Sequence, residues 1–482
     1  MLLLPELLSA QGREFWFAAP EVTSRHADKP IVLRIYSFNK AADITISQPA
    51  NGNFTVIKDH IPANSFKTID ITSQIDQIET KPSNQVLNTG LLVQATSDVN
   101  AYYEVIGRPG GLTANNSEIF VLKGNNALGT LFYVPMQTES NNQAQNNLDA
   151  WASFDIVATE NNTIVKITPN RNLLGHNKGE TFNIVLNKGQ TFSSRALSTQ
   201  GSERPAGSKI ESDKPIAVTY KDDSILKDVN YWDLIGDQIL PVSELGTEYI
   251  AIRNSGYILP NSDSDSDIVY VVATKNQTEI VINEDTVVLN EGETYKYRFY
   301  IKEIDGTNDT VKTASIHSSE KIYVLHVSGF FNELGAANLL PLNCTGSKQT
   351  IFVRTNSEFF SINILVKSGG EGNFKLNGAS SSIINASFKD VPETNGSWKY
   401  ARIPLGTSAI GINIPYTLTN STHNFHLCVL NGGILTSFKY GYFSGFANLN
   451  LGPDKFLCPD KSIVLDAGLN KDSYEIQKRT PY

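Results

Sequence analysis

The sequence predicts an all-β protein made of four quasi-repeats, each with about six or seven short strands in a β-sandwich-like unit. Three observations predict this class. Short runs alternate apolar and polar residues, as half-buried strands do. Gly, Asn, Pro and Ser turn residues separate these runs. The same signatures recur 100 to 117 residues apart. A β-propeller with two blades per repeat predicts a similar number of strands and is the alternative architecture.

An opening strand that follows a glycine starts each repeat. GREFWFAAP begins at Gly12, GTLFYVPMQ at Gly129, GTEYIAIRN at Gly246, and the looser GSKQTIFVR follows from Gly346. The regular spacing of these starts predicts one supersecondary unit per repeat.

A predicted β-hairpin is the second shared signature. ATENNTIVKITP covers residues 158–169 and ATKNQTEIVINE covers residues 273–284, while SFNKAADITISQP at 37–49 is a diverged copy. The Asn-rich dipeptide favours a turn, because Asn tolerates left-handed backbone angles. The alternating residues that follow predict a strand with one buried face.

A strand after a polar turn closes each repeat. SDVNAYYEV begins at Ser97, SDKPIAVTY at Ser212, SSEKIYVLHV at Ser318 and STHNFHLCVL at Ser421. Only ITSQIDQIE, at residues 71–79, resembles a helix.

The two ends of the chain differ from the repeats. MLLLPELLSAQ resembles the end of a secretory signal, with an apolar stretch before a small-residue cleavage site. LNLGPDKFLCPDKSIVLDA, near the C-terminus, resembles the first strands of a further sandwich. The predicted organisation is a signal-peptide remnant at 1–11, repeat 1 at 12–128, repeat 2 at 129–245, repeat 3 at 246–345, repeat 4 at 346–448, and the start of an Ig-like module at 449–482.

Composition and charge exclude some classes of partner. Of the 482 residues, 40% are hydrophobic, enough to fill folded cores. The formal net charge is -9 and no basic stripe occurs, so we expect no nucleic-acid partner. No run approaches the roughly 18 apolar residues of a membrane helix, so we expect no membrane insertion.

Three places in the sequence hold candidate ligand-binding residues. The KDDS stretch after the closing strand of repeat 2 is acidic, although a charged loop is the plainer interpretation. An exposed Tyr-Trp pair makes a good anchor for proteins or sugars, although packing is the alternative. A His and an Asp lie on the first predicted loop, where they either contribute to binding or only form structural hydrogen bonds. The candidate ligand-binding residues are Asp222, Asp223, Tyr231, Trp232, His26 and Asp28.

A calcium site is a further hypothesis. Asp263, Asp265 and Asp267 place carboxylates at alternate positions of a predicted loop, and calcium prefers hard oxygen ligands. The glycine and distal glutamate of an EF-hand are missing, and a solvated loop is the alternative. Apart from calcium, we expect no cofactor.

The three cysteines leave their pairing open. Cys344 and Cys428 lie within or beside one repeat, where they form a disulfide or stay as buried thiols. Cys458 lies in the C-terminal segment and has no evident partner.

The opening segment of repeat 1, the ATENNT signature and GSKIESDKPIAVTYKDDS resemble the IgGFc-binding-protein N-terminal domain family. The resemblance runs from about Gly12 to Asn450 and is closest to the variant on large secreted Bacteroidota proteins that use type IX secretion. The family name implies antibody Fc binding in some members. No motif carries that activity, so no binding residue is transferred.

Three functions follow as hypotheses. The first is a secreted or cell-surface binding or adhesion protein, non-catalytic, that recognises an extracellular protein or glycan. The second is a secreted polysaccharide hydrolase or lyase, whose paired carboxylates would leave no fixed spacing in sequence. The third is a structural spacer that displays a distal module. Neither the ligand nor the oligomeric state follows from the sequence.

Overall fold

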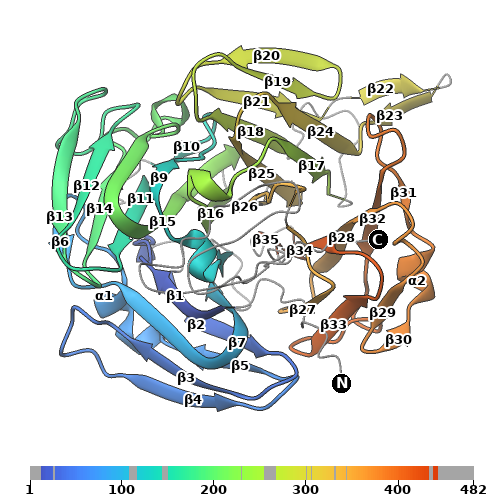
Figure 1. Cartoon of the computed structure of the whole chain (residues 1–482), viewed down its shortest axis with the longest axis horizontal. Helices are drawn as coiled ribbons and strands as arrows, with labels where there is room; N and C mark the ends of the chain where they lie inside the picture. Colours follow the sequence, from blue (N-terminus) through green and yellow to red (C-terminus); the bar gives the residue numbers. More distant parts are fainter. Residues whose placement is uncertain are drawn as a thin grey trace, which may run out of the picture.

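The structure is a computed structural model that confirms the all-β class and the tandem sandwich units. It describes residues 12–24, 28–107, 117–143, 150–228, 231–254, 267–299, 301–304, 307–330, 333–343, 345–433 and 438–442. Figure 1 shows these units arranged round the centre of the molecule in chain order, from blue to orange.

Repeat 1 is a sandwich whose two sheets share one long strand. The first half of β7 pairs with β1 and β3, and the second half pairs with β2 and β8. The sheets therefore have the orders β1-β7-β3-β4 and β5-β2-β7-β8, and their inner faces form one hydrophobic core. The strands are β1 Gly12–Phe17, β2 Ile31–Ser37, β3 Ala42–Ser47, β4 Ile57–Ile61, β5 Phe66–Asp70, β7 Leu91–Val105 and β8 Glu118–Leu122.

Repeat 2 has the same topology. The long strand β15 takes the place of β7, which gives the orders β9-β15-β12-β13 and β14-β11-β15-β16. Two short strands are added: β10 (Asn141–Asn142) pairs with β15, and β6 (Val86–Leu87) of repeat 1 pairs with β14. The remaining strands are β9 Gly129–Tyr133, β11 Ala152–Ala158, β12 Thr163–Thr168, β13 Phe182–Leu186, β14 Thr191–Arg195, β15 Lys209–Asp228 and β16 Tyr231–Gln238.

Repeat 3 divides the long strand into two. Its sheets have the orders β17-β24-β19-β20 and β21-β18-β25-β26, and a β22–β23 hairpin is inserted. The strands are β17 Glu248–Ile252, β18 Ile268–Ala273, β19 Thr278–Ile282, β20 Asp285–Leu289, β21 Thr294–Arg298, β22 Ile301–Ile304, β23 Thr307–Thr310, β24 Thr313–Ser318, β25 Ile322–Phe330 and β26 Glu333–Asn338.

Repeat 4 follows repeat 3, with the sheet orders β27-β33-β29-β30 and β31-β32-β28-β34-β35. All four units therefore share one strand order, to which repeat 4 adds the edge strand β31. The strands are β27 Gln349–Val353, β28 Phe359–Lys367, β29 Phe374–Leu376, β30 Ala379–Ser380, β31 Lys389–Asp390, β32 Trp398–Pro404, β33 Pro415–Asn420, β34 Phe425–Gly432 and β35 Phe438–Tyr442.

The predicted hairpins are wrong in one respect. The turn is present, with Asn162 and Gln277 at φ angles of 55° at equivalent positions. However, β11 and β12 do not pair with each other, because β11 pairs with β14 and β15 while β12 pairs with β13 and β15. The turn is an arch from one sheet of the sandwich to the other. Alternation shows that each strand has a buried face but not which sheet it joins.

Helix is confined to single turns in the described residues. The predicted segment at 71–79 forms a 3-10 turn (Thr72–Gln74) and then α1 (Ile75–Ile78). A second short helix, α2 (Ser382–Asn385), was not predicted; the Ser381 hydroxyl caps it by accepting a bond from Ile384 N–H. The described helices include none that is long and apolar enough to cross a membrane.

The four sandwiches close into a ring. Their last strands meet at the centre, where β8 lies beside β16, β16 beside β26, β26 beside β35, and β35 beside β8 (Figure 1). Apolar side chains from neighbouring units also share clusters: one contains Trp16 and Val157, another Ile250 and Leu365, and a third Tyr102 and Phe352. The last of these clusters joins repeat 4 back to repeat 1.

Buried carboxylates tie the last strands together. Glu118 accepts hydrogen bonds from the backbone N–H groups of Ala336 in repeat 3 and Tyr440 in repeat 4, each at 3.0 Å. Asp237 of repeat 2 accepts a bond from Asn338 N–H of repeat 3 at 3.3 Å. Burial raises the pKa of Glu118 well above its ordinary value. These contacts give the ring a rigid centre, from which its outer loops are held in place.

Candidate functional site

A pocket at the junction of repeats 1 and 2 is the candidate site. Its volume is about 390 Å³. Repeat 1 supplies loop residues and repeat 2 supplies the ends of β11 and β14 together with the loop after β12. The lining residues are Glu21, Lys81, Pro82, Ser83, Trp151, Leu174 and Arg195.

Backbone contacts hold the repeat 1 side of this pocket. Val22 N–H donates to the Glu79 carboxylate at 3.0 Å, and Thr80 N–H donates to the Ala19 carbonyl at 2.9 Å. Past the cis peptide between Lys81 and Pro82, Asn84 N–H donates to a carbonyl in β14. Strand β6 then joins the edge of β14. The two repeats therefore share a sheet edge directly below the pocket.

Trp151 and Arg195 form the repeat 2 wall. Trp151 immediately precedes β11, Arg195 ends β14, and the two strands pair at Ser153 and Arg195. The guanidinium carbon of Arg195 lies 4.1 Å from the centre of the Trp151 ring, a cation–π contact. Both side chains are half-buried, so each keeps some surface for a ligand.

Lys81 and Glu21 supply the charges on the opposite wall. The Lys81 ammonium lies 2.8 Å from a Glu79 oxygen and 3.1 Å from an Asp76 oxygen. Partial burial lowers the pKa of Lys81, but the bonds to Glu79 and Asp76 outweigh it and raise the pKa overall. The charge of Lys81 is therefore already balanced within the protein, whereas Glu21 forms no ion pair with the other described residues.

Two buried carboxyl groups lie behind the pocket walls. Burial raises the pKa of Glu79 to about 7, against the opposing bond from Lys81. Burial also raises the pKa of Asp155, on β11, to about 7, and the charge of Glu21 adds to that rise. Neither group lines the pocket, so both act on a ligand only through their charge.

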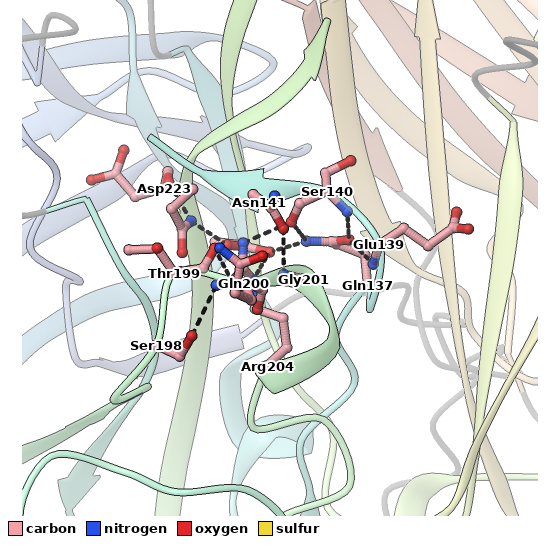
Figure 2. A network of polar contacts seen from close by, with 12 residues as sticks. Gln137, Glu139, Ser140, Asn141, Ser198, Thr199, Gln200, Gly201, Arg204 and Asp223 are labelled. Carbon is pink, nitrogen blue, oxygen red and sulfur yellow. Dashed lines mark hydrogen bonds and ion pairs between the residues drawn. The ribbon is translucent and has the colours of Figure 1, made fainter. Parts of the chain in front are cut away.

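Asp222, a predicted ligand-binding residue, is buried and bonds to Arg204 and Gln137, two members of the polar network shown in Figure 2. Arg204 Nε donates to Asp222 at 2.8 Å, and both side chains are 0% exposed. Gln137 and Asn142 also donate to this carboxylate, at 2.6 and 2.7 Å. The Arg204 guanidinium further donates to three backbone carbonyls, those of Ser140, Thr199 and Gln200. The network fixes the loops that precede β11 and follow β14.

Asp223 joins repeat 2 to repeat 1. Its carboxylate accepts a bond from Thr23 N–H at 2.7 Å, across 200 residues of sequence. Asp28, another predicted residue, is 7% exposed, and burial and the nearby Asp223 charge raise its pKa. Three of the predicted residues thus gather at the junction that carries the pocket, although none of them lines it. Direct contact between Asp222, Asp223 or Asp28 and a ligand stays a prediction.

The other predicted residues lie elsewhere or outside the described residues. Trp232 is half-buried on β16, opposite Leu226 in register, and Tyr231 begins the same strand. His26 lies outside the described residues, as do Asp263 and Asp265 of the calcium hypothesis.

Asp267, the third calcium candidate, is buried beside His326. Its Oδ1 lies 3.0 Å from His326 Nε2 and accepts a bond from Asn254 N–H. Burial raises the pKa of Asp267, but the hydrogen bond and charge of His326 lower it overall. The part of the chain that the structure describes contains no cluster of three or more metal-binding side chains. The calcium site stays a prediction.

Cys428 is buried on β34, and burial raises its pKa to about 12. Cys344 and Cys458 lie outside the described residues, so the choice between a Cys344–Cys428 disulfide and buried thiols is not tested.

The pocket residues themselves were missed from sequence. Trp151 and Arg195 are 44 residues apart in the chain and meet only because β11 and β14 are neighbours. One signal was available in the sequence. Trp151 is one of only four tryptophans, and it directly precedes the strand that leads into the arch.

The protein is a ring of four β-sandwiches, and a polar, partly aromatic pocket lies between the first two. This chain belongs to the IgGFc binding protein family, whose model matches residues 118–430. The match confirms the family predicted from sequence but starts at β8, later than the expected Gly12. Trp151, Leu174 and Arg195 lie within it, and the repeat 1 side of the pocket lies before it.

The other comparisons add little. The comparison with curated proteins gave no match. The comparison with solved structures gave, among others, the "tetra-tandem repeat in extending region of large adhesion protein", with 10% identity over 90% of this chain and 99% of that chain. Its TM-score is 0.09, too low to support an argument about fold or function.

Proposed function

We propose that this chain is an extracellular, non-catalytic binding or adhesion protein that recognises a protein or glycan ligand. The pocket between repeats 1 and 2 carries the proposal. It combines an aromatic ring, a guanidinium and a carboxylate on a rigid frame, which is the usual composition of a recognition site. Membership of a family described as IgGFc binding supports a binding role and makes antibody Fc one candidate ligand.

Catalysis fits the pocket less well. Glycoside hydrolysis needs two carboxyl groups that face the same bond. The lining residues include one carboxylate, Glu21. Glu79 and Asp155 have the raised pKa of a general acid, but they are 2% and 0% exposed. A polymer cannot reach them without a rearrangement of the junction.

Secretion, a Bacteroidota source with type IX secretion, and an Ig-like module after repeat 4 belong to the same proposal. The apolar start with its small-residue site supports export. Sequencing the N-terminus of protein recovered from the culture medium tests this. Cleavage within residues 9–11 supports secretion, and an intact Met1 on cell-retained protein contradicts it.

A binding assay with a matched pair of tryptophan variants tests the function. The full chain is applied to a glycan array and to surfaces coated with antibody Fc. We expect Trp151→Ala to weaken any binding at least tenfold, because it removes the pocket's aromatic wall. Trp398→Ala is the control, since the Trp398 ring also has a cation over it, Lys367, but lies in repeat 4. No ligand on either surface would favour the spacer hypothesis instead, and equal loss in both variants would show that binding does not depend on this pocket.

A further inference from the structure

We infer that the pocket between repeats 1 and 2 binds a sugar that carries one carboxylate, with Arg195 holding the carboxylate and Trp151 supporting the ring. This inference rests on the proposed binding function and names the chemical class of the ligand. It covers uronic acids and sialic acids, which share a carboxylate on a hydroxylated ring.

Arg195 is the charge available to a ligand. Among the described residues, its guanidinium contacts the Trp151 ring and forms no ion pair or side-chain hydrogen bond. Other arginines of the chain differ: Arg204 pairs with Asp222, and Arg34 pairs with Glu104. A guanidinium has five N–H donors in a planar fork that matches the two oxygens of a carboxylate. Arg195 can therefore form a bidentate contact with the carboxylate of a ligand, because no described carboxylate of the protein occupies it.

Trp151 adds a stacking surface. Its side chain is half-buried, so part of the ring stays open to a ligand, although its Nε1 is itself buried. Indole rings pack well against molecules that have apolar and polar faces, as sugars do. The ring therefore favours a sugar over a simple inorganic anion.

The remaining charges of the pocket favour a ligand with one carboxylate over a ligand with several anionic groups. Lys81 is balanced by Glu79 and Asp76, so it adds little attraction for a second anionic group. Glu21 repels further anions and accepts hydrogen bonds from hydroxyl groups. The buried carboxyl groups of Glu79 and Asp155 also oppose a high density of negative charge. A polysulfated chain is therefore a poor ligand.

The size of the pocket limits the ligand further. A volume of about 390 Å³ lies near the lower end of ligand pockets, which range over roughly 300–1,000 Å³. It accommodates a terminal sugar rather than a folded domain.

Calorimetric titration of the full chain with four defined probes tests this inference. The probes are the methyl glycosides of glucuronic acid and N-acetylneuraminic acid, each as the free acid and as the neutral methyl ester. We expect at least one acid to bind about tenfold or more tightly than its ester, because the ester cannot form the charged bidentate contact. Comparison of the two acids shows whether the pocket prefers a uronic acid or a sialic acid.

Two variants complete the test. Arg195→Met should remove the preference for acid over ester, while Arg171→Met, on a half-buried arginine of the same repeat that does not line the pocket, should leave it unchanged. Thermal unfolding of both variants shows that they remain folded. Ester binding equal to acid binding overturns the inference, as does the absence of binding by both acids up to millimolar concentration. If Trp151→Ala still weakens binding to the array or to Fc in that case, the proposed function stands and only the ligand class is wrong.

Discussion

At the scale of single residues, the molecule depends on buried carboxylates that accept several hydrogen bonds. Asp222 receives bonds from Arg204, Gln137 and Asn142, all within repeat 2. Burying a charge is expensive unless partners compensate for the lost water. The KDDS stretch that contains Asp222 was singled out from sequence for its acidity. Sequence could not show its burial, because Arg204 and Gln137 approach it from separate loops.

Removing Arg204 should destabilise the protein strongly. Arg204→Met leaves the Asp222 charge buried without its cation, so we expect the free energy of unfolding to fall by about 3–5 kcal/mol in urea titrations. Arg171→Met, at an arginine bonded only to backbone carbonyls near the surface, should change it by less than about 0.5 kcal/mol. The double variant Arg204→Met/Asp222→Leu should recover part of the loss. Equal effects at Arg204 and Arg171 would show that the pair contributes nothing.

Asp155 should make stability depend on pH. Burial raises its folded pKa to about 7, so between its ordinary value and pH 7 the folded state binds a proton that the unfolded state has lost. Its stabilising effect is therefore complete at low pH and is lost as the pH rises towards 7. From pH 5 to pH 8, we expect the wild type to lose about 2–3 kcal/mol more than Asp155→Asn, whose side chain has no proton to lose. Parallel pH profiles in urea titrations would contradict this.

At the scale of elements, the repeats share a detailed arch. In repeat 2, the Thr163 hydroxyl donates to the Glu160 carbonyl, and in repeat 3 the Thr278 hydroxyl donates to the Lys275 carbonyl, both at 2.8 Å. The turn was predictable because Asn and Thr have local preferences that do not depend on the rest of the fold. The pairing of the strands was not predictable, because the strands on either side of the arch pair with strands far away in the chain.

Exchanging the turn residues between repeats should shift stability in opposite directions. Asn162 and Gln277 both have a φ of 55°, a conformation that Asn tolerates better than Gln. We expect Gln277→Asn to raise the free energy of unfolding by about 0.5 kcal/mol and Asn162→Gln to lower it by a similar amount. Thermal unfolding of the two single variants measures this. A shift of the same sign in both would show that contacts of the side chains outweigh backbone strain.

At the scale of the whole molecule, four similar sandwiches form one ring. Alternating strands, recurring signatures and turn residues were enough to predict the all-β class and the sandwich units. Closure of the ring was not predictable, because it depends on shared clusters of residues such as Tyr102 and Phe352, which look like ordinary core residues in sequence. The pocket lies at a junction of this ring and was missed for the same reason.

Lys439 should control the contact between repeats 4 and 1. Its ammonium and the Arg34 guanidinium both bond to Glu104, and all three side chains are buried. Lys439→Met leaves Glu104 with one cation, so we expect a loss of about 2 kcal/mol and faster hydrogen exchange of the β8 and β35 amides. Lys399→Met removes an exposed pair with Asp390 and should leave exchange in β8 unchanged. Uniform acceleration across all four repeats in Lys439→Met would show that the ring opens only by global unfolding.

Ring closure also determines how the molecule would respond to tension. In an open string of sandwiches, a pull applied between Gly12 and Tyr442 would pass through every unit in series. Here β35 lies beside β8, so the two points of attachment belong to adjoining units. Force would cross the seam where Lys439 meets Glu104 and where Tyr440 N–H meets Glu118, and repeats 2 and 3 would be shielded from it. The seam would part first, and the ring would open into a longer chain of intact sandwiches.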